Sequence, residues 1–239
     1  MAKLSDKIAL VTGGTGGLGS IVSQSLAREG AVVIVTHSGS RQSLQKLLNL
    51  QKNFSIIEGI CLDATKEDSV QSSISDVFKR FGRIDILCNV VGGIGEKRLI
   101  EETPLSEWNE MMTVNLQSCF LMMKNVIPSM KKNGFGRIIN IAAKTGVTQE
   151  AQRGGYGVSK AGVIALTETA AAEFKEFADL TVNAIAPSII VTEENKRWGT
   201  EEQIQQWVTP DQIAQMIIHL CSDQGVAING QIIHMYGKV

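Results

Sequence analysis

The chain has 239 residues, of which 44% are hydrophobic and 20% charged, and 23 Lys and Arg face 24 Asp and Glu. This length suits one large domain with a sizeable core better than two small ones. The formal net charge of -1 and the absence of long runs of one sign argue against nucleic acid and anionic membrane surfaces as partners. No apolar run is long enough to span a membrane, and the N-terminus is polar, so we expect a cytoplasmic protein.

The cysteine pattern agrees with a reducing compartment. Cys61, Cys88, Cys119 and Cys221 are far apart in the sequence and form no C-x-x-C pair. We interpret them as buried apolar thiols, and the alternative is a catalytic thiol. We predict no metal site and no disulfide.

A glycine-rich stretch follows the first predicted strand, at residues 8–11. Residues 7–20 read KIALVTGGTGGLGS, and a helical pattern resumes at Ile21. The glycines at 14, 16 and 19 fit the G-x-G-x-x-G dinucleotide fingerprint, and Thr12 with the glycines at 13, 17 and 19 fits a longer spacing. Without a Cβ, the backbone N–H groups can approach a pyrophosphate at the positive end of a helix. The pattern favours a dinucleotide site over an ordinary glycine-rich turn.

The end of the second predicted strand, residues 31–35, bears on the choice of cofactor. An acidic residue near this point would hold the ribose 2′-hydroxyl of NAD, but His37 stands there. With Ser38, Ser40 and Arg41 able to bind a 2′-phosphate, we expect NADP to be preferred over NAD. The alternatives are a solvated Arg41 and a His37 exposed on a loop.

Strand and helix patterns then alternate along the rest of the chain. We predict strands at 54–62, 83–91, 136–143, 180–186 and 230–235, and helices at 42–52, 66–81, 105–130, 155–177 and 211–221, with Pro128 breaking the third of these helices. This order predicts a single α/β domain, residues 1–239, with a doubly wound parallel seven-stranded sheet of the Rossmann type.

Two further expectations come from this pattern. Residues 188–209 form a long polar excursion at the edge where such sheets bind ligands, so we predict a substrate lid there. The long helices at 105–130 and 155–177 carry more apolar residues than one sheet face requires. We therefore expect a homo-oligomer, a dimer or tetramer, and the alternative is packing within one subunit.

Tyr156 and Lys160 are four residues apart in a helical segment and so share one face. A nearby ammonium group favours the phenolate and lowers the pKa of a tyrosine, which makes this pair a proton donor and its tuner. The alternative is an exposed tyrosine above an exposed lysine.

Five motifs together resemble the classical short-chain dehydrogenases/reductases. They are residues 12–19, C-N-V-V-G at 88–92, Asn115 within T-V-N-L, Tyr156-x-x-x-Lys160, and residues 187–192. Within this family, the first half of the chain is more similar to the 3-oxoacyl-carrier-protein reductases than the second half is. The family's N-N-A-G is N-V-V-G here, with a bulkier interior that affects local packing.

The resemblance implies roles for individual residues. Tyr156 would be the proton donor or acceptor, Lys160 would lower its pKa and bind the nicotinamide ribose, and Asn115 would hold a water in the proton relay. Asp63 would contact adenine, Asn89 would lie beside the adenosine ribose, and Ile190 and Thr192 would meet the carboxamide. The full set of expected cofactor-binding residues is Gly13, Thr15, Gly17, Leu18, Gly19, His37, Ser38, Arg41, Asp63, Ala64, Asn89, Val90, Gly92, Tyr156, Lys160, Pro187, Ile190 and Thr192.

The family's catalytic serine is missing, because the position thirteen residues before Tyr156 is Ala143. Alanine cannot donate to the substrate oxygen, and losing one such donor costs on the order of 10² to 10³ in rate. Lys144, Thr145 and Thr148 are candidate replacements, and the alternative is that they are solvated loop residues. Ala143 and Lys144 are the expected substrate residues.

Dihydropteridine reductase also has alanine and lysine at these two positions, and residues 187–210 resemble its C-terminal part. We therefore expect an NAD(P)H-dependent oxidoreductase acting on a carbonyl or quinonoid small molecule. The alternatives are a 3-oxoacyl-carrier-protein or general carbonyl reductase with a substitute donor, and a cofactor-binding, catalytically weak regulatory or assembly protein.

Overall fold

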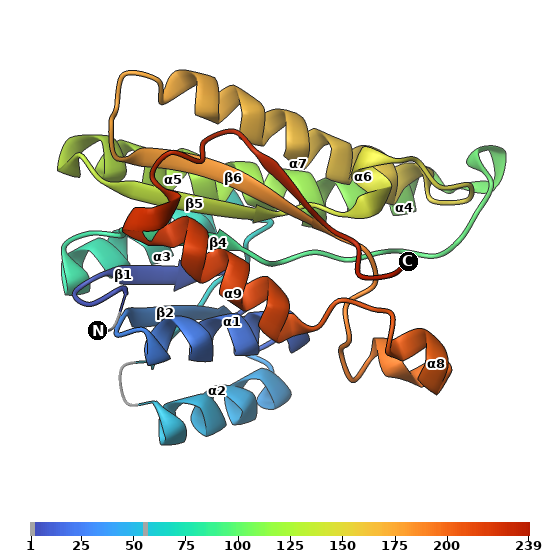
Figure 1. Cartoon of the computed structure of the whole chain (residues 1–239), viewed down its shortest axis with the longest axis horizontal. Helices are drawn as coiled ribbons and strands as arrows, with labels where there is room; N and C mark the ends of the chain where they lie inside the picture. Colours follow the sequence, from blue (N-terminus) through green and yellow to red (C-terminus); the bar gives the residue numbers. More distant parts are fainter. Residues whose placement is uncertain (1–2, 55–56) are drawn as a thin grey trace.

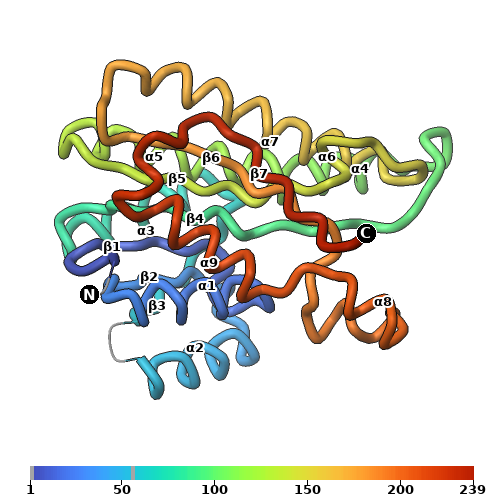
Figure 2. Tube along the Cα trace, viewed as in Figure 1, coloured from blue at the N-terminus to red at the C-terminus, as the bar shows by residue number. Residues whose placement is uncertain are grey.

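The computed structural model describes residues 3–54 and 57–239. A parallel sheet in the strand order β3-β2-β1-β4-β5-β6-β7 lies at its centre (Figure 1). The strands are β1 (Ile8–Val11), β2 (Val32–His37), β3 (Ile57–Cys61), β4 (Ile86–Asn89), β5 (Gly136–Ile141), β6 (Leu180–Pro187) and β7 (Ile232–Met235). The predicted doubly wound, seven-stranded α/β domain is confirmed. The strand order places β3 and β7 at the two edges of the sheet, and both strands are labelled in Figure 2.

Helices cover both faces of the sheet. One face packs against α1 (Gly17–Arg28), α2 (Arg41–Asn53) and α9 (Pro210–Cys221). The other face packs against α3 (Glu67–Phe81), α5 (Ser118–Asn133) and α7 (Gly154–Glu173). Strand order reverses between β1 and β4, so the carboxyl ends of these two strands border the crevice in which such sheets bind ligands.

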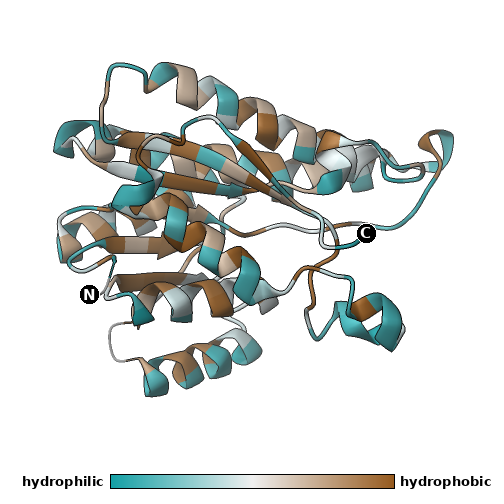
Figure 3. Ribbon diagram, viewed as in Figure 1, coloured by the Kyte–Doolittle hydropathy of each residue, from teal (hydrophilic) through white to brown (hydrophobic). Residues whose placement is uncertain are grey.

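The strands form where buried apolar residues succeed one another. Alternate residues of β1 serve opposite faces, since Ala9 and Val11 belong to the α1 side and Leu10 to the α3 side. Every residue of β4, β5 and β6 is buried, as expected for strands covered on both faces. Figure 3 shows this as hydrophobic strands beneath helices whose outer surfaces are more hydrophilic.

The predicted helix at 105–130 is interrupted by a π-helical turn. The segments are α4 (Leu105–Met111), the π turn η2 (Met112–Gln117) and α5. A π turn inserts an extra residue into the helical ladder and occurs frequently at functional sites. Here the turn contains Asn115, whose side chain is buried.

Several predicted boundaries were wrong. Helix α1 begins at Gly17, not Ile21, because packing against α9 compensates for the weak helix propensity of glycine. Pro128 does not break α5, which continues to Asn133 and ends at Gly134 in the left-handed conformation. Helix α7 ends at Glu173, before residue 177.

Smaller elements complete the chain. They are η1 (Ile100–Glu102), α6 (Lys144–Val147), η3 (Asn195–Arg197), α8 (Glu201–Ile204) and η4 (Asp223–Gly225). Residues 55–56 of the strand predicted at 54–62 lie outside the described residues. Within 3–54 and 57–239, no helix combines the length and hydropathy that crossing a membrane requires.

A buried polar network joins the two central strands to the helices behind them. The Oδ1 atom of Asn140 on β5 accepts a hydrogen bond from Nδ2 of Asn89 on β4 at 2.9 Å. Its Nδ2 donates to Oγ1 of Thr167 on α7, also at 2.9 Å. Asn140 is fully buried, so these bonds replace the water that its amide loses on folding.

We predict that Asn140→Ala lowers the free energy of unfolding by roughly 2 to 4 kcal/mol, because it removes packed volume and leaves buried polar partners unpaired. Urea unfolding checks this value. The control is Asn133→Ala at the exposed end of α5, for which we expect a change within about 0.5 kcal/mol. Equal values for the two variants would show that the network contributes nothing.

Candidate functional site

The glycine turn brings bare backbone to the start of α1. Gly13 has a φ of 61°, a left-handed conformation that favours glycine. At Gly19 a Cβ atom would lie 2.2 Å from the carbonyl oxygen of Gly13, so no larger residue fits there. The N-cap residue Gly16 has no capping side chain. The first N–H groups of α1 are therefore left available for an anionic group.

Thr12 joins the glycine turn to the loop after β4. Its buried Oγ1 atom accepts hydrogen bonds from the N–H groups of Val90 and Val91, at 2.9 and 3.1 Å. The hydroxyl of Thr36 on β2 accepts one from the N–H of Gly13 at 3.0 Å. Two threonine hydroxyls thus hold the backbone of the loops that border the crevice between β1 and β4.

Neutral and cationic groups lie at the end of β2. His37 is the last residue of the strand, and its Nδ1 atom accepts a hydrogen bond from the N–H of Gly39. Burial lowers the pKa of His37, which favours the neutral imidazole. Ser38 bonds to Ser40 and to Ser43, a residue that the sequence analysis did not select. Arg41 is exposed at the start of α2.

Asn115 and Lys160 meet beneath the glycines that follow β4. The Asn115 side chain accepts from the N–H of Gly93 and donates to its carbonyl oxygen, both at 2.9 Å. It also donates to Oγ of Ser159 at 3.0 Å. A Cβ atom on Gly92 would lie 2.8 Å from Asn115 Oδ1 and 3.2 Å from Lys160 Nζ. The structure therefore brings three of the predicted residues together.

Lys160 is buried and donates from Nζ to the carbonyl oxygen of Ile141 at 2.7 Å. Burial lowers its pKa to about 8. The ammonium form still predominates at neutral pH, so a positive charge is held at the carboxyl end of β5. Ser159, which links this region to Asn115, was missed, because a serine within an alanine-rich helix gives no distinct sequence signal.

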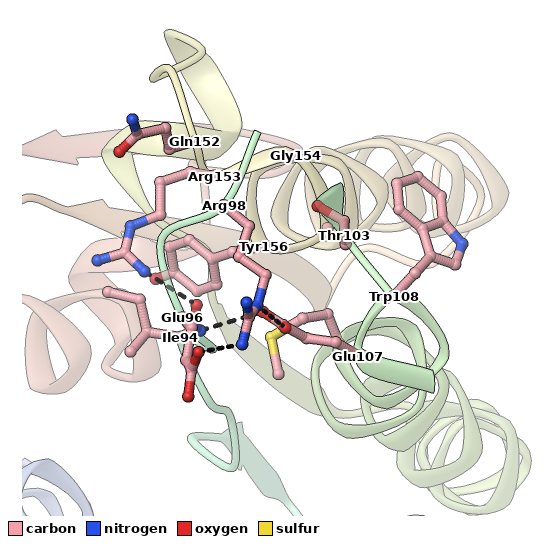
Figure 4. Close-up of a pocket in the computed structure, with 12 residues that line it drawn as sticks. Ile94, Glu96, Arg98, Thr103, Glu107, Trp108, Gln152, Arg153, Gly154 and Tyr156 are labelled. Atoms are coloured by element: carbon pink, nitrogen blue, oxygen red, sulfur yellow. Dashed lines mark hydrogen bonds and ion pairs between the residues drawn. The ribbon is translucent and has the colours of Figure 1, made fainter. Parts of the chain in front are cut away.

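Tyr156 faces a different set of charges from the one expected. Burial raises its pKa to about 12, whereas the Arg153 guanidinium acts to lower it and the Glu150 carboxylate to raise it. The expectation that Lys160 lowers the pKa of this phenol is wrong for the structure. Although the two residues share a helix face, Lys160 is bound to Ile141, and the Tyr156 ring lies beside Arg153 in a separate pocket (Figure 4).

Ala143 is buried and extended at the N-cap of α6. The next residue, Lys144, donates from Nζ to the backbone oxygen of Val239 at 3.2 Å and lies over the ring of Tyr236. The Thr145 methyl group faces Gly157 on α7. The Lys144 ammonium is thus engaged at the C-terminus, while Thr145 and Thr148 stay candidate donors.

Residues 188–209 are held together by contacts within the segment. Ile190 forms a bridge with Val208, and Asn195 donates from Nδ2 to the carbonyl oxygen of Ile190 at 2.9 Å. The rings of Trp198 and Trp207 are 4.8 Å apart. Thr192 reaches the glycine turn, since a Cβ atom on Gly17 would lie 3.0 Å from its methyl group.

Further predicted residues lie along the same edge of the sheet. Pro187 ends β6, and Ala64 is buried after β3. Asp63 accepts from the Thr65 hydroxyl, and this bond lowers the Asp63 pKa. The Oδ1 atom of Asn89 is buried without a hydrogen-bond partner in the described chain.

Comparisons with known proteins point to one family. A family model described as short chain dehydrogenase matches residues 7–203. The chain is 30% identical to the 3-oxoacyl-[acyl-carrier-protein] reductase FabG of Aquifex aeolicus (strain VF5) over 244 residues, covering 98% of each chain. It is 31% identical to the D-beta-hydroxybutyrate dehydrogenase of Rhizobium meliloti (strain 1021) over 255 residues, covering 97% of each.

Solved structures agree. The crystal structure of a candidate gluconate dehydrogenase from Agrobacterium tumefaciens matches with a TM-score of 0.91 at 25% identity, covering 98% of this chain and 96% of that one. The glycine turn fits the pyrophosphate of a dinucleotide, because the Gly19 position excludes side chains and the α1 N-terminus presents free donors. The chain therefore belongs to the short-chain dehydrogenase/reductase family and is an NAD(P)-dependent oxidoreductase.

Proposed function

We propose that this protein reduces a carbonyl or quinonoid small molecule, with Tyr156 as the proton donor and NADPH as the preferred cofactor. The observation that carries this proposal is the convergence of Asn115 and Lys160 on Gly92 and Gly93, one helical turn from Tyr156. When bound, the cofactor supplies the hydride. The protein residues hold the substrate and deliver the proton.

Each of the three residues has a distinct part in proton delivery. With a pKa of about 12, the Tyr156 phenol is protonated at neutral pH and can donate to a substrate oxygen that gains negative charge. Lys160 holds a positive charge at the carboxyl end of β5, one helical turn from Tyr156, where it can bind the cofactor. Asn115 holds the backbone after β4 and so keeps the crevice open beside them.

The alternatives named from the sequence differ in substrate or in catalytic role. A 3-oxoacyl-carrier-protein or general carbonyl reductase is supported by the FabG relative. A quinonoid substrate, dihydropterin included, is supported by Ala143 and Lys144, because an activated conjugated system depends less on a donor at residue 143. A weakly catalytic regulatory protein is less well supported, since Tyr156, Lys160 and Asn115 are all present.

We predict that Tyr156→Phe lowers kcat by roughly 10² to 10⁴, because the variant has no proton to donate. Stopped-flow or steady-state oxidation of NADPH measures the effect with quinonoid dihydropterin and with a 3-oxoacyl thioester. Binding of NADPH, followed by tryptophan fluorescence, serves as the control and should remain unchanged. Unchanged turnover would exclude Tyr156 as the proton donor.

Ala143→Ser tests the missing hydroxyl. We predict that kcat/KM for a 3-oxoacyl thioester rises roughly 10² to 10³, the usual value of one such donor. Turnover of quinonoid dihydropterin should change much less, which makes it the internal control. If thioester reduction is already efficient in the native protein and the variant gains nothing, another group supplies the hydrogen bond.

Arg41→Ala tests the preference for NADPH. A guanidinium that binds the 2′-phosphate forms a charge-assisted hydrogen bond, which the variant loses. We therefore expect the dissociation constant for NADPH to rise roughly tenfold or more and the constant for NADH to stay unchanged. Calorimetric titration with each cofactor gives both values. Lys46→Ala, which removes an exposed cation from the same helix, is the matched control. Equal changes for NADPH and NADH would contradict the assignment.

A further inference from the structure

Arg153 occupies an unusual position, three residues before Tyr156. It is the N-cap of α7, a 20-residue helix, where polar residues that accept hydrogen bonds are preferred. A cation is electrostatically unfavourable there, because the helix N-terminus already carries partial positive charge. The preceding residue, Gln152, has a φ of 65°, which is uncommon for a residue other than glycine. Local rules broken in this way are expected at functional sites.

The acidic groups near Arg153 are bound to other cations. Glu96 and Glu107 both pair with Arg98, and Glu150 pairs with Lys97 at 3.3 Å. Arg153 forms no ion pair within the described part of the chain. Its Nη1 atom donates only to two carbonyl oxygens, of Ile94 at 3.4 Å and Gly95 at 3.1 Å. The guanidinium thus lacks an anionic partner.

The Arg153 guanidinium and the Tyr156 ring line the same pocket, between α4, α7 and the loop after β4 (Figure 4). The side chains of Trp108 and Met111 add apolar surface to its wall. The guanidinium also favours the Tyr156 phenolate, so its charge acts at the phenol. A group bound by Arg153 would therefore lie next to the proposed proton donor.

The bonds that now hold Arg153 are replaceable. Carbonyl acceptors at 3.1 and 3.4 Å give weaker hydrogen bonds than a carboxylate, which can bind a guanidinium through two parallel bonds. The space in this pocket that admits water amounts to about 10 Å³, so binding of a ligand requires the Arg153 side chain to leave the carbonyls of Ile94 and Gly95 in the loop after β4. Gly95, with a φ of 63°, lies in that loop, and Ile94 beside it is exposed.

We propose that Arg153 binds a carboxylate of the substrate, so that this enzyme favours small oxo acids and other carboxylate-bearing acceptors over uncharged carbonyl compounds. The proposal rests on the proposed function and specifies its substrate class. Arg153 exchanges the Ile94 and Gly95 carbonyls for the carboxylate, and the reacting carbon is thereby held beside Tyr156.

The test compares Arg153→Gln with the native enzyme on paired substrates. Acetoacetate and pyruvate are each matched with their methyl esters, which keep the ketone and remove the charge. We expect KM for the acids to rise roughly 10- to 100-fold in the variant, as for loss of a charge-assisted hydrogen bond, with KM for the esters nearly unchanged. Calorimetric titration of the NADPH-saturated protein with malonate, which is not reduced, should show the same loss of affinity.

Two further variants separate charge from structure. Arg153→Lys keeps the charge and should recover part of the acid affinity. Lys97→Gln removes a neighbouring charge that does not line the pocket, and it should leave both acids and esters as in the native enzyme. A parallel rise in KM for acids and esters, no change for either, or no malonate binding to the native protein would overturn the proposal.

These results are distinguishable from a failure of the proposed function. If Tyr156→Phe retains full turnover but Arg153→Gln loses malonate binding selectively, the proton donor is misassigned and the carboxylate site stands. If Tyr156→Phe is inactive but Arg153→Gln discriminates no acid from its ester, the function stands and the carboxylate site is wrong.

Discussion

The crevice of this enzyme depends on the hydroxyl group of Thr12. The loop after β1 leads to α1 on one face of the sheet, and the chain after β4 leads to α5 on the other face. Thr12 Oγ1 supplies an acceptor for two N–H groups of the second loop. Because an unpaired buried N–H costs on the order of 1 to 3 kcal/mol, this single atom keeps both loops in register.

The π turn at Asn115 extends the same arrangement to the catalytic side. An uninterrupted α-helix would direct residue 115 differently, because each added residue turns the face by about 100°. With the extra residue of the turn, the amide of Asn115 meets both backbone groups of Gly93 and the hydroxyl of Ser159. The loop after β4 is thus fixed at one end by Thr12 and at the other by Asn115.

Sequence periodicity predicted the parallel sheet and its order of elements, because buried strands and amphipathic helices are encoded locally. The glycine turn was also predictable, because its glycines are close together in the sequence. The structure gives the reason for one of them, since Gly19 leaves no room for a side chain. The start of α1 and the orientation of the Tyr156 side chain could not be predicted from the sequence. Both depend on contacts between distant segments, because α1 packs against α9 and the Tyr156 side chain lines a pocket with residues of α4 and of the loop after β4. Arg153 could have been selected from the sequence, because it lies one helical turn before Tyr156.

Ala143 and Arg153 affect different contributions to the reaction rate. A serine hydroxyl would stabilise the negative charge that develops on the reacting oxygen, and alanine cannot provide this hydrogen bond. A guanidinium that binds a remote carboxylate does not replace it, because its hydrogen bonds are already formed in the ground state. It acts instead by orientation, and binding energy from a non-reacting part of a substrate can offset the cost of holding the reacting centre in place. With no hydroxyl at residue 143, such positioning has to supply a larger share of the rate.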